Sequence, residues 1–232
     1  MRRIPAAVWA LLVGVACLPA PVLAESGYRL LRLDGGFLKW GTARMGEGAT
    51  VTYALADGPR VAAKARNCGR MTAMTALLDG AGIDLPEFLG ELRAAFRMWE
   101  TVADLQFELI EDADAAQIVI GAQTVPRGRA YANVSYDQQV GGPHRLTRSL
   151  VCLNPAMAWK VGFGGAAGSY DLRYVLAHEI GHAIGLDHAG IRTHLMSFRY
   201  TETRRGLSAG DAAGAAALYG RPANLSKTAL KQ

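Results

Sequence analysis

The chain has 232 residues, of which 50% are hydrophobic and 19% charged, and its 25 Lys and Arg residues against 20 Asp and Glu residues give a formal net charge of +5 at pH 7. This modest excess excludes a strongly basic nucleic-acid-binding protein, and we expect no nucleic-acid partner. The length and the apolar content suffice for one domain with a buried core.

The first residues have the pattern of a cleavable export signal. Arg2 and Arg3 precede an apolar stretch over residues 4–18, and the segment ends at Val22-Leu23-Ala24. A membrane anchor is the alternative, but the stretch is shorter than the roughly 20 apolar residues that a spanning helix needs. We therefore expect residues 1–24 to be removed, without a stable membrane anchor, and the protein to be secreted or periplasmic.

Farther along the chain, apolar residues recur with the periods of strands and of one long helix. Residues 50–55 alternate as a strand does, and residues 85–102 carry an apolar stripe at helical spacing that predicts core packing. Four more strands are predicted at 105–110, 117–120, 130–136 and 149–153.

Residues 178–188 read His-Glu-Ile-Gly-His-Ala-Ile-Gly-Leu-Asp-His. On a helix, the side chains of His178 and His182 leave the same face one turn apart, so both can reach one ion. Gly185 can adopt the left-handed conformation that ends a helix, which would turn the chain back and bring His188 to the same ion. Three histidines are a ligand set for catalytic zinc, which keeps its fourth position for water.

Glu179 follows the first histidine and points along another radius of the helix, so it is better placed for a water molecule on the metal than for the metal itself. Zinc lowers the pKa of water from about 15.7 to near 7, and the carboxylate would take the proton and pass it to a leaving amine. The pattern favours peptide-bond hydrolysis with Glu179 as general base. The alternative is a histidine-rich helix that packs in a core and binds no metal.

Further matches extend beyond this motif. Met196 lies eight residues after His188, in Leu-Met-Ser-Phe-Arg-Tyr, and residues 207–220 end in Leu-Tyr-Gly. These features resemble the metzincin metallopeptidases and, within them, the matrixins, over about residues 37–220. A serralysin-like protease is the alternative, but the sequence contains no glycine-aspartate nonapeptide repeat.

The resemblance implies an α+β metzincin fold, with a twisted, mostly parallel five-stranded sheet, backing helices, an active-site helix and a small C-terminal subdomain. It implies a catalytic domain over residues 25–220, and we expect residues 221–232 to be a flexible tail. It also implies that Met196 lies in a turn beneath the metal. Phe198 and Tyr200 would line the pocket for the residue after the cleaved bond, which we expect to be apolar.

By the same resemblance, the protein is expected to be a monomeric zinc endopeptidase acting on protein or peptide substrates. Two alternatives come from other classes, namely a zinc-binding interaction module without catalysis and a hydrolase of nonpeptide amides. The presence of Glu179 disfavours the interaction module, because loss of the base would be its expected sign.

One zinc ion is expected per chain. Animal matrix metalloproteinases hold a second, structural zinc through histidines between their third and fifth strands, where this sequence has only His144. A single histidine cannot build a closed tetrahedral site. Calcium needs six to eight oxygen ligands, whereas Asp137 and Asp171 stand isolated, so the sequence leaves calcium open without supporting it.

Cys68 and Cys152 are the two cysteines that remain once the leader, with Cys17, is removed. Residues 66–70, Arg-Asn-Cys-Gly-Arg, superficially resemble the propeptide switch whose cysteine ligates the zinc in many matrixins, but they follow the first strand instead of preceding it. Even pairing in an exported protein favours a disulfide. It would tie an inserted segment, residues 61–82, to the fifth strand beside the cleft.

Overall fold

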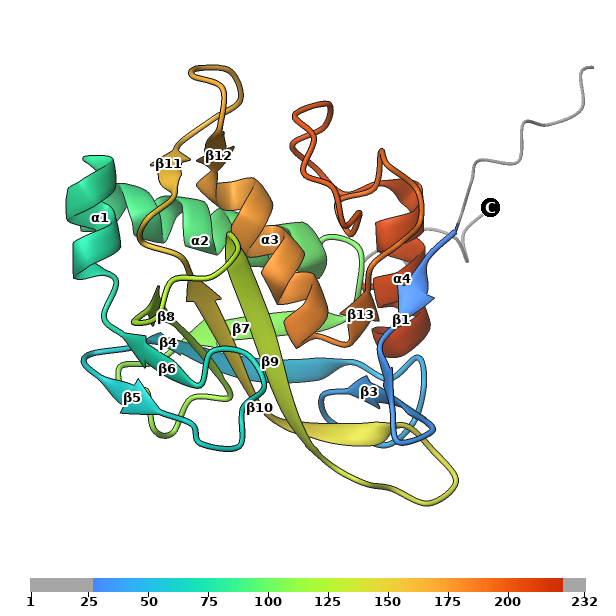
Figure 1. Cartoon of the computed structure of the whole chain (residues 1–232). Coiled ribbons are helices and arrows are strands. Elements are labelled where there is room, and N and C mark those ends of the chain that lie inside the picture. The colour runs from blue at the N-terminus through green and yellow to red at the C-terminus, as the bar shows by residue number, and fades with distance from the viewer. Residues whose placement is uncertain (1–26, 223–232) are drawn as a thin grey trace, which may run out of the picture.

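The computed structural model describes residues 27–222 (Figure 1). The predicted leader and nearly all of the predicted tail lie outside these residues. Among the helices of the described part, none combines the length and apolar character needed to cross a membrane.

The five predicted strands all belong to one mixed sheet. They are β4 (Ala49–Leu55), β7 (Leu105–Leu109), β8 (Ile118–Gln123), β9 (Ala130–Asp137) and β10 (His144–Leu153). The order β7-β4-β8-β10 is parallel, and β9 pairs antiparallel with β10. All six residues of β8 are buried, as expected of a strand inside a parallel sheet. Because β10 is its one strand partner in the described residues, β9 keeps its other edge free.

Four shorter strands enlarge the sheet beyond the predicted five. The strand β3 (Gly36–Lys39) pairs with the beginning of β10, and β2 (Arg32–Leu33) pairs with β3. The strands β5 (Arg60–Val61) and β6 (Arg70–Thr72) form a hairpin, and β6 pairs with the end of β8. Two separate two-stranded sheets pair β1 (Arg29–Leu30) with β13 (Leu186–Asp187), and β11 (Ala158–Lys160) with β12 (Ser169–Asp171). Segments of two to four residues are too short to show a clear alternation in the sequence.

The predicted long helix is α2 (Leu85–Glu100), which follows the short α1 (Thr75–Ala81). Its N-cap Asp84 accepts a hydrogen bond from the Glu87 N–H, and its apolar stripe is buried. The motif helix is α3 (Leu172–Ala183), and both helices cover the same face of the sheet (Figure 1). The fully buried Trp99 joins them by donating its indole N–H to the carbonyl of Ala177 at 2.9 Å.

The chain after α3 forms a small C-terminal part that ends in α4 (Ala209–Tyr219). The hydroxyl of Tyr219 donates to the carbonyl of Ile184 at 2.7 Å and accepts from the backbone N–H of Trp40 at 3.0 Å. The last helix is thereby fixed against the end of α3. The arrangement confirms the predicted α+β metzincin fold with its small C-terminal subdomain.

Candidate metal centre

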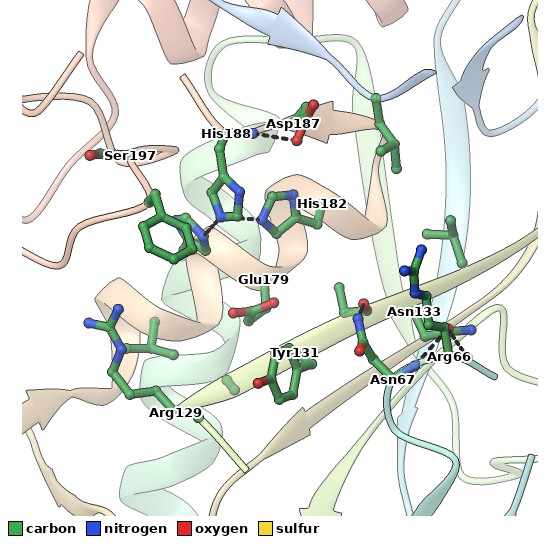
Figure 2. A pocket seen from close by; sticks show the side chains of 18 of the residues that line it. Arg66, Asn67, Arg129, Tyr131, Asn133, Glu179, His182, Asp187, His188 and Ser197 are labelled. Carbon is green, nitrogen blue, oxygen red and sulfur yellow. Dashed lines mark hydrogen bonds between the residues drawn. The ribbon is translucent and has the colours of Figure 1, made fainter. Parts of the chain in front are cut away.

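His178, His182 and His188, called here the histidine triad, meet in one group. Figure 2 shows the rings of His182 and His188 turned toward each other. The first two project from α3, and the chain then turns at Gly185, whose φ is 99°. A side chain at Gly185 would also place its Cβ 2.1 Å from the carbonyl oxygen of Leu38, so only glycine fits there. Nε2 of His188 lies 3.3 Å from Nε2 of His178 and 3.2 Å from Nε2 of His182.

These distances fit a single zinc ion. Zinc–nitrogen bonds of roughly 2.0–2.1 Å in tetrahedral geometry place the nitrogens about 3.3 Å apart. The Nδ1 atoms of His178 and His182 lie 2.7 Å and 2.8 Å from the carbonyl oxygens of Leu195 and Leu186. These carbonyls hold the protons on Nδ1, so the Nε2 lone pairs are directed toward the shared point.

Burial keeps these imidazoles in the neutral form that binds a metal. Desolvation, reinforced by the neighbouring His182, lowers the pKa of His178 well below its usual value. Desolvation likewise lowers the pKa of His182 to about 4 and lowers that of His188. The donor set therefore suits zinc in both geometry and charge.

Glu179 is buried between the histidine triad and β9 (Figure 2). Burial raises the pKa of its carboxyl to about 8, against the opposing effects of a backbone hydrogen bond with Ala132 and of the Arg129 guanidinium. The carboxyl lines the cleft beside the histidines, whereas the donor atoms that converge on one point, among the described residues, are those of the three imidazoles. This position suits proton transfer.

The methionine turn lies against α3, where Gly181 leaves room for it. A Cβ at Gly181 would stand 2.3 Å from the Met196 sulfur. Asp211 of α4 holds the turn, because its carboxylate accepts hydrogen bonds from the backbone N–H groups of Leu195 and Met196 at 2.8 and 3.1 Å. The carbonyl of Leu195 in turn contacts Nδ1 of His178, so Asp211 helps to position the His178 ring through the turn.

Asp211 is a site residue that the motif reasoning missed. Its sequence signal is the spacing Ser208-x-x-Asp211, because the Ser208 side chain caps α4 while Asp211 accepts the Ser208 N–H in return. That pattern predicts a helix start, but only the fold shows that the same carboxylate reaches the methionine turn.

A second missed group fixes the start of α3. Asp171 caps α3 by accepting the Tyr174 N–H at 2.8 Å, and its carboxylate also pairs with Arg205 at 2.8 Å. The buried carboxylate of Glu91, on α2, forms ion pairs with the guanidinium groups of Arg173 and Arg205 at 2.7 and 2.6 Å. These partners lie up to 114 positions apart in the chain, so no local pattern predicts the network.

The triad opens into a cleft of about 670 Å³. Phe198 and Tyr200 both line it, and the Phe198 ring stands 5.2 Å from the His188 ring. Tyr200 is fixed by its hydroxyl, which accepts from the Asp171 N–H at 2.8 Å and donates to Glu202 at 2.7 Å. The start of β9 forms the facing wall.

Cys68 and Cys152 form a disulfide, with their Cα atoms 5.7 Å apart. Cys68 is therefore engaged away from the histidine triad, unlike a zinc-binding switch cysteine. His144 and His194, the remaining histidines, are buried elsewhere and do not join the triad.

Comparisons with known proteins agree with this geometry. The chain is 28% identical to karilysin of Tannerella forsythia over 58% of this chain and 29% of that protein. It is 30% identical to metalloendoproteinase 1-MMP of Arabidopsis thaliana over 60% of this chain and 40% of that protein. It is 33% identical to matrix metalloproteinase-19 of Homo sapiens over 56% of this chain and 25% of that protein. The chain thus spans less than half the length of these curated relatives. A family model described as matrixin matches residues 82–220, a range that contains the histidine triad, Glu179 and the methionine turn, and the chain therefore belongs to the matrixin family.

Proposed function

We propose that the protein is an exported zinc endopeptidase in which the histidine triad holds the metal and Glu179 is the general base. One observation carries the proposal, namely the convergence of three Nε2 lone pairs beside a buried carboxyl group, in a cleft bordered by a free strand edge.

When bound, zinc would supply an activated water and polarise the scissile carbonyl. A bound cation would favour the ionised form of Glu179 against the burial that raises its pKa. The role of Glu179 is then to accept a proton on its carboxylate and to deliver it to the nitrogen of the leaving amine. The carbonyls of Leu195 and Leu186 keep His178 and His182 oriented throughout. Met196 supports the triad from below, and no covalent bond to the enzyme is needed.

The free edge of β9 provides the binding surface for an extended peptide. Ala132 faces this edge, because its backbone meets Glu179 and its carbonyl accepts the Asn67 side chain instead of a group on β10. A peptide that adds a strand here passes Glu179 at the level of Ala132, where it would replace the Asn67 side chain as the hydrogen-bond partner of the Ala132 carbonyl. Protein or peptide substrates are thus the class that the cleft suits.

The direction in which the peptide lies along β9 follows from the position of the pocket for the residue after the cleaved bond. Tyr200 and Phe198 would receive the residue after the cleaved bond. Arg129, which immediately precedes β9, lies over the Tyr200 ring at 5.6 Å. The downstream half of the substrate therefore lies along the start of β9, and the upstream half lies toward its end. The aromatic lining favours an apolar side chain in this pocket.

The test is cleavage of unfolded casein and a quenched peptide library by the purified protein, with chelator and after zinc is restored. We expect chelation to abolish cleavage and zinc to recover it. Glu179→Gln should lower kcat/KM at least about 100-fold, because a positioned base contributes roughly 10²–10⁴. The matched control is Glu108→Gln, which alters an exposed glutamate on β7. Stoichiometric zinc without cleavage of any peptide would favour the interaction module instead.

Export is tested separately, by expressing the full chain with its leader in a bacterial host. The pattern at residues 1–24 supports cleavage after Ala24. N-terminal sequencing of the exported protein should then begin at Glu25, and protein retained in the cytoplasm with an intact Met1 would contradict this part of the proposal. Size-exclusion chromatography of the same material tests the expected monomer.

A further inference from the structure

Part of the cleft wall comes from a segment outside the range matched by the family model. Residues 62–69, called here the rim loop, connect β5 to β6 and precede the matched residues 82–220. Lys64, Arg66 and Asn67 of this loop nevertheless line the same cleft as Glu179. Figure 2 shows Arg66 and Asn67 beside Asn133 of β9.

The rim loop is fixed to the sheet at several points. The Cys68–Cys152 disulfide links it to β10, and the side-chain oxygen of Asn133 accepts the backbone N–H groups of Arg66 and Asn67 at 2.9 and 3.2 Å. The Asn67 side chain donates to the carbonyl of Ala132 at 3.4 Å. The backbone of this loop therefore holds a set position relative to the strand edge on which a substrate would pair.

The loop brings two positive charges to the cleft. Lys64 and Arg66 are exposed, and neither forms an ion pair with a carboxylate of the described residues. Of the acidic groups that line the cleft, Glu179 is committed to the site, and Asp187 already pairs with Arg29 at 3.1 Å. The charges on the loop are thus available to a ligand.

Their place along the cleft assigns them to one half of a substrate. The loop contacts β9 at Ala132 and Asn133, at the level of Glu179, whereas Arg129 lies at the opposite end of the cleft, as Figure 2 shows. Since the downstream half of the peptide runs toward Arg129, the rim loop faces the residues that precede the cleaved bond.

We propose that Lys64 and Arg66 are specificity-determining residues that favour Asp or Glu in the substrate shortly before the cleaved bond. This inference rests on the proposed peptidase function. A carboxylate there would meet two cations carried by a loop whose backbone is fixed beside the cleft. The attraction acts between exposed groups, so each pair contributes modestly and depends on salt.

The test compares quenched peptides that differ only in having Glu, Gln or Lys at one of the three positions before the bond. For the wild-type protein we expect kcat/KM to be about fivefold higher for Glu than for Gln at one or more of these positions. This ratio should fall toward one in Lys64→Gln/Arg66→Gln and as the ionic strength rises from about 0.05 to about 0.5 M. Arg70→Gln is the matched control, because Arg70 is an exposed cation of the same insertion that does not line this cleft.

A charge-reversed variant, Lys64→Glu/Arg66→Glu, should turn the preference toward the Lys peptide. Equal cleavage of the Glu and Gln peptides by wild type, or an unchanged ratio in Lys64→Gln/Arg66→Gln, would overturn the inference and leave the peptidase proposal standing. Absence of cleavage for every peptide, with zinc bound, would instead overturn the proposed function and this inference with it.

Discussion

Asp211 shows how a single residue outside the histidine motif can govern the metal centre. Its buried carboxylate accepts four hydrogen bonds, from the N–H groups of Leu195, Met196 and Ser208 and from the Ser208 hydroxyl. In Asp211→Asn, an amide group would face some of these donors and leave them unpaired, so the methionine turn and His178 behind it should loosen. We expect zinc affinity to fall about 10- to 100-fold, measured by competition with a chromophoric chelator.

The control for this variant is Asp79→Asn, which makes the same change at an exposed position of α1. It should bind zinc as wild type does. An Asp211→Asn protein with unchanged zinc affinity would show that the turn keeps its position without the carboxylate.

Glu202 offers a pH-dependent contribution to stability near the cleft. The ion pair with Lys160, the Gly164 N–H and the Tyr200 hydroxyl lower its pKa from 4.5 to about 2. Because the folded-state pKa lies below the unfolded value, Glu202 stabilises the fold above about pH 4.5, and this contribution is lost as the pH falls toward 2. Since the pair is partly exposed, Glu202→Gln should cost only about 1 kcal/mol at neutral pH.

Urea unfolding of wild type and Glu202→Gln over this pH range measures the effect. The difference in the free energy of unfolding should shrink as the solution is acidified. A difference that stays constant across the range would mean that the variant loses packing or hydrogen bonding instead of a charge.

At the scale of elements, the disulfide fastens the rim loop and the hairpin β5–β6 to β10 across 84 positions of sequence. Cross-links that close long loops restrict the unfolded chain most, so removing this one should lower the free energy of unfolding by about 2–5 kcal/mol. The variant is Cys68→Ala/Cys152→Ala, compared with wild type by urea unfolding. A reductant should destabilise wild type by a similar amount and leave the variant unchanged, whereas a variant as stable as wild type would contradict the prediction.

The elements that the sequence predicted are those in which buried apolar residues recur at a regular spacing along the chain. The helix α2 was expected over 85–102 and occurs at Leu85–Glu100, because Phe88, Leu92 and Trp99 share one buried stripe. In contrast, β10 begins at His144, five residues before the predicted strand, because the first of its inward-facing positions holds the polar His144 and only Leu146 is apolar there. The short strands and the Glu91 network depend on distant partners and leave no local period.

The residues of the candidate site also differ in whether a local pattern in the sequence predicts them. The histidine triad and Glu179 fall within 11 consecutive residues, so helix geometry and one glycine sufficed to bring them together from sequence. The rim loop and Asp211 reach the cleft only through the sheet, the disulfide and α4. Local motifs therefore identify the chemistry, whereas the walls that would select a substrate come from the fold of the whole chain.

For the whole molecule, the metal centre joins two parts that folding must first bring together. Two of the proposed ligands belong to α3, and the third, His188, lies beyond the turn at Gly185, in the part that α4 and the methionine turn hold in place. Zinc should therefore bind the folded chain far better than the unfolded one, and free zinc at about 1,000 times its dissociation constant would add about 4 kcal/mol to stability.

This coupling predicts that the Tm measured by calorimetry rises with zinc and falls with chelator. In His188→Ala the zinc-dependent increment should largely disappear, because two imidazoles on one helix form a weaker site. His144→Ala is the control, since it removes a buried histidine outside the triad and should lower the Tm while preserving the increment. An increment that survives in His188→Ala would mean that the third histidine contributes little to binding and that the two parts are coupled by packing alone.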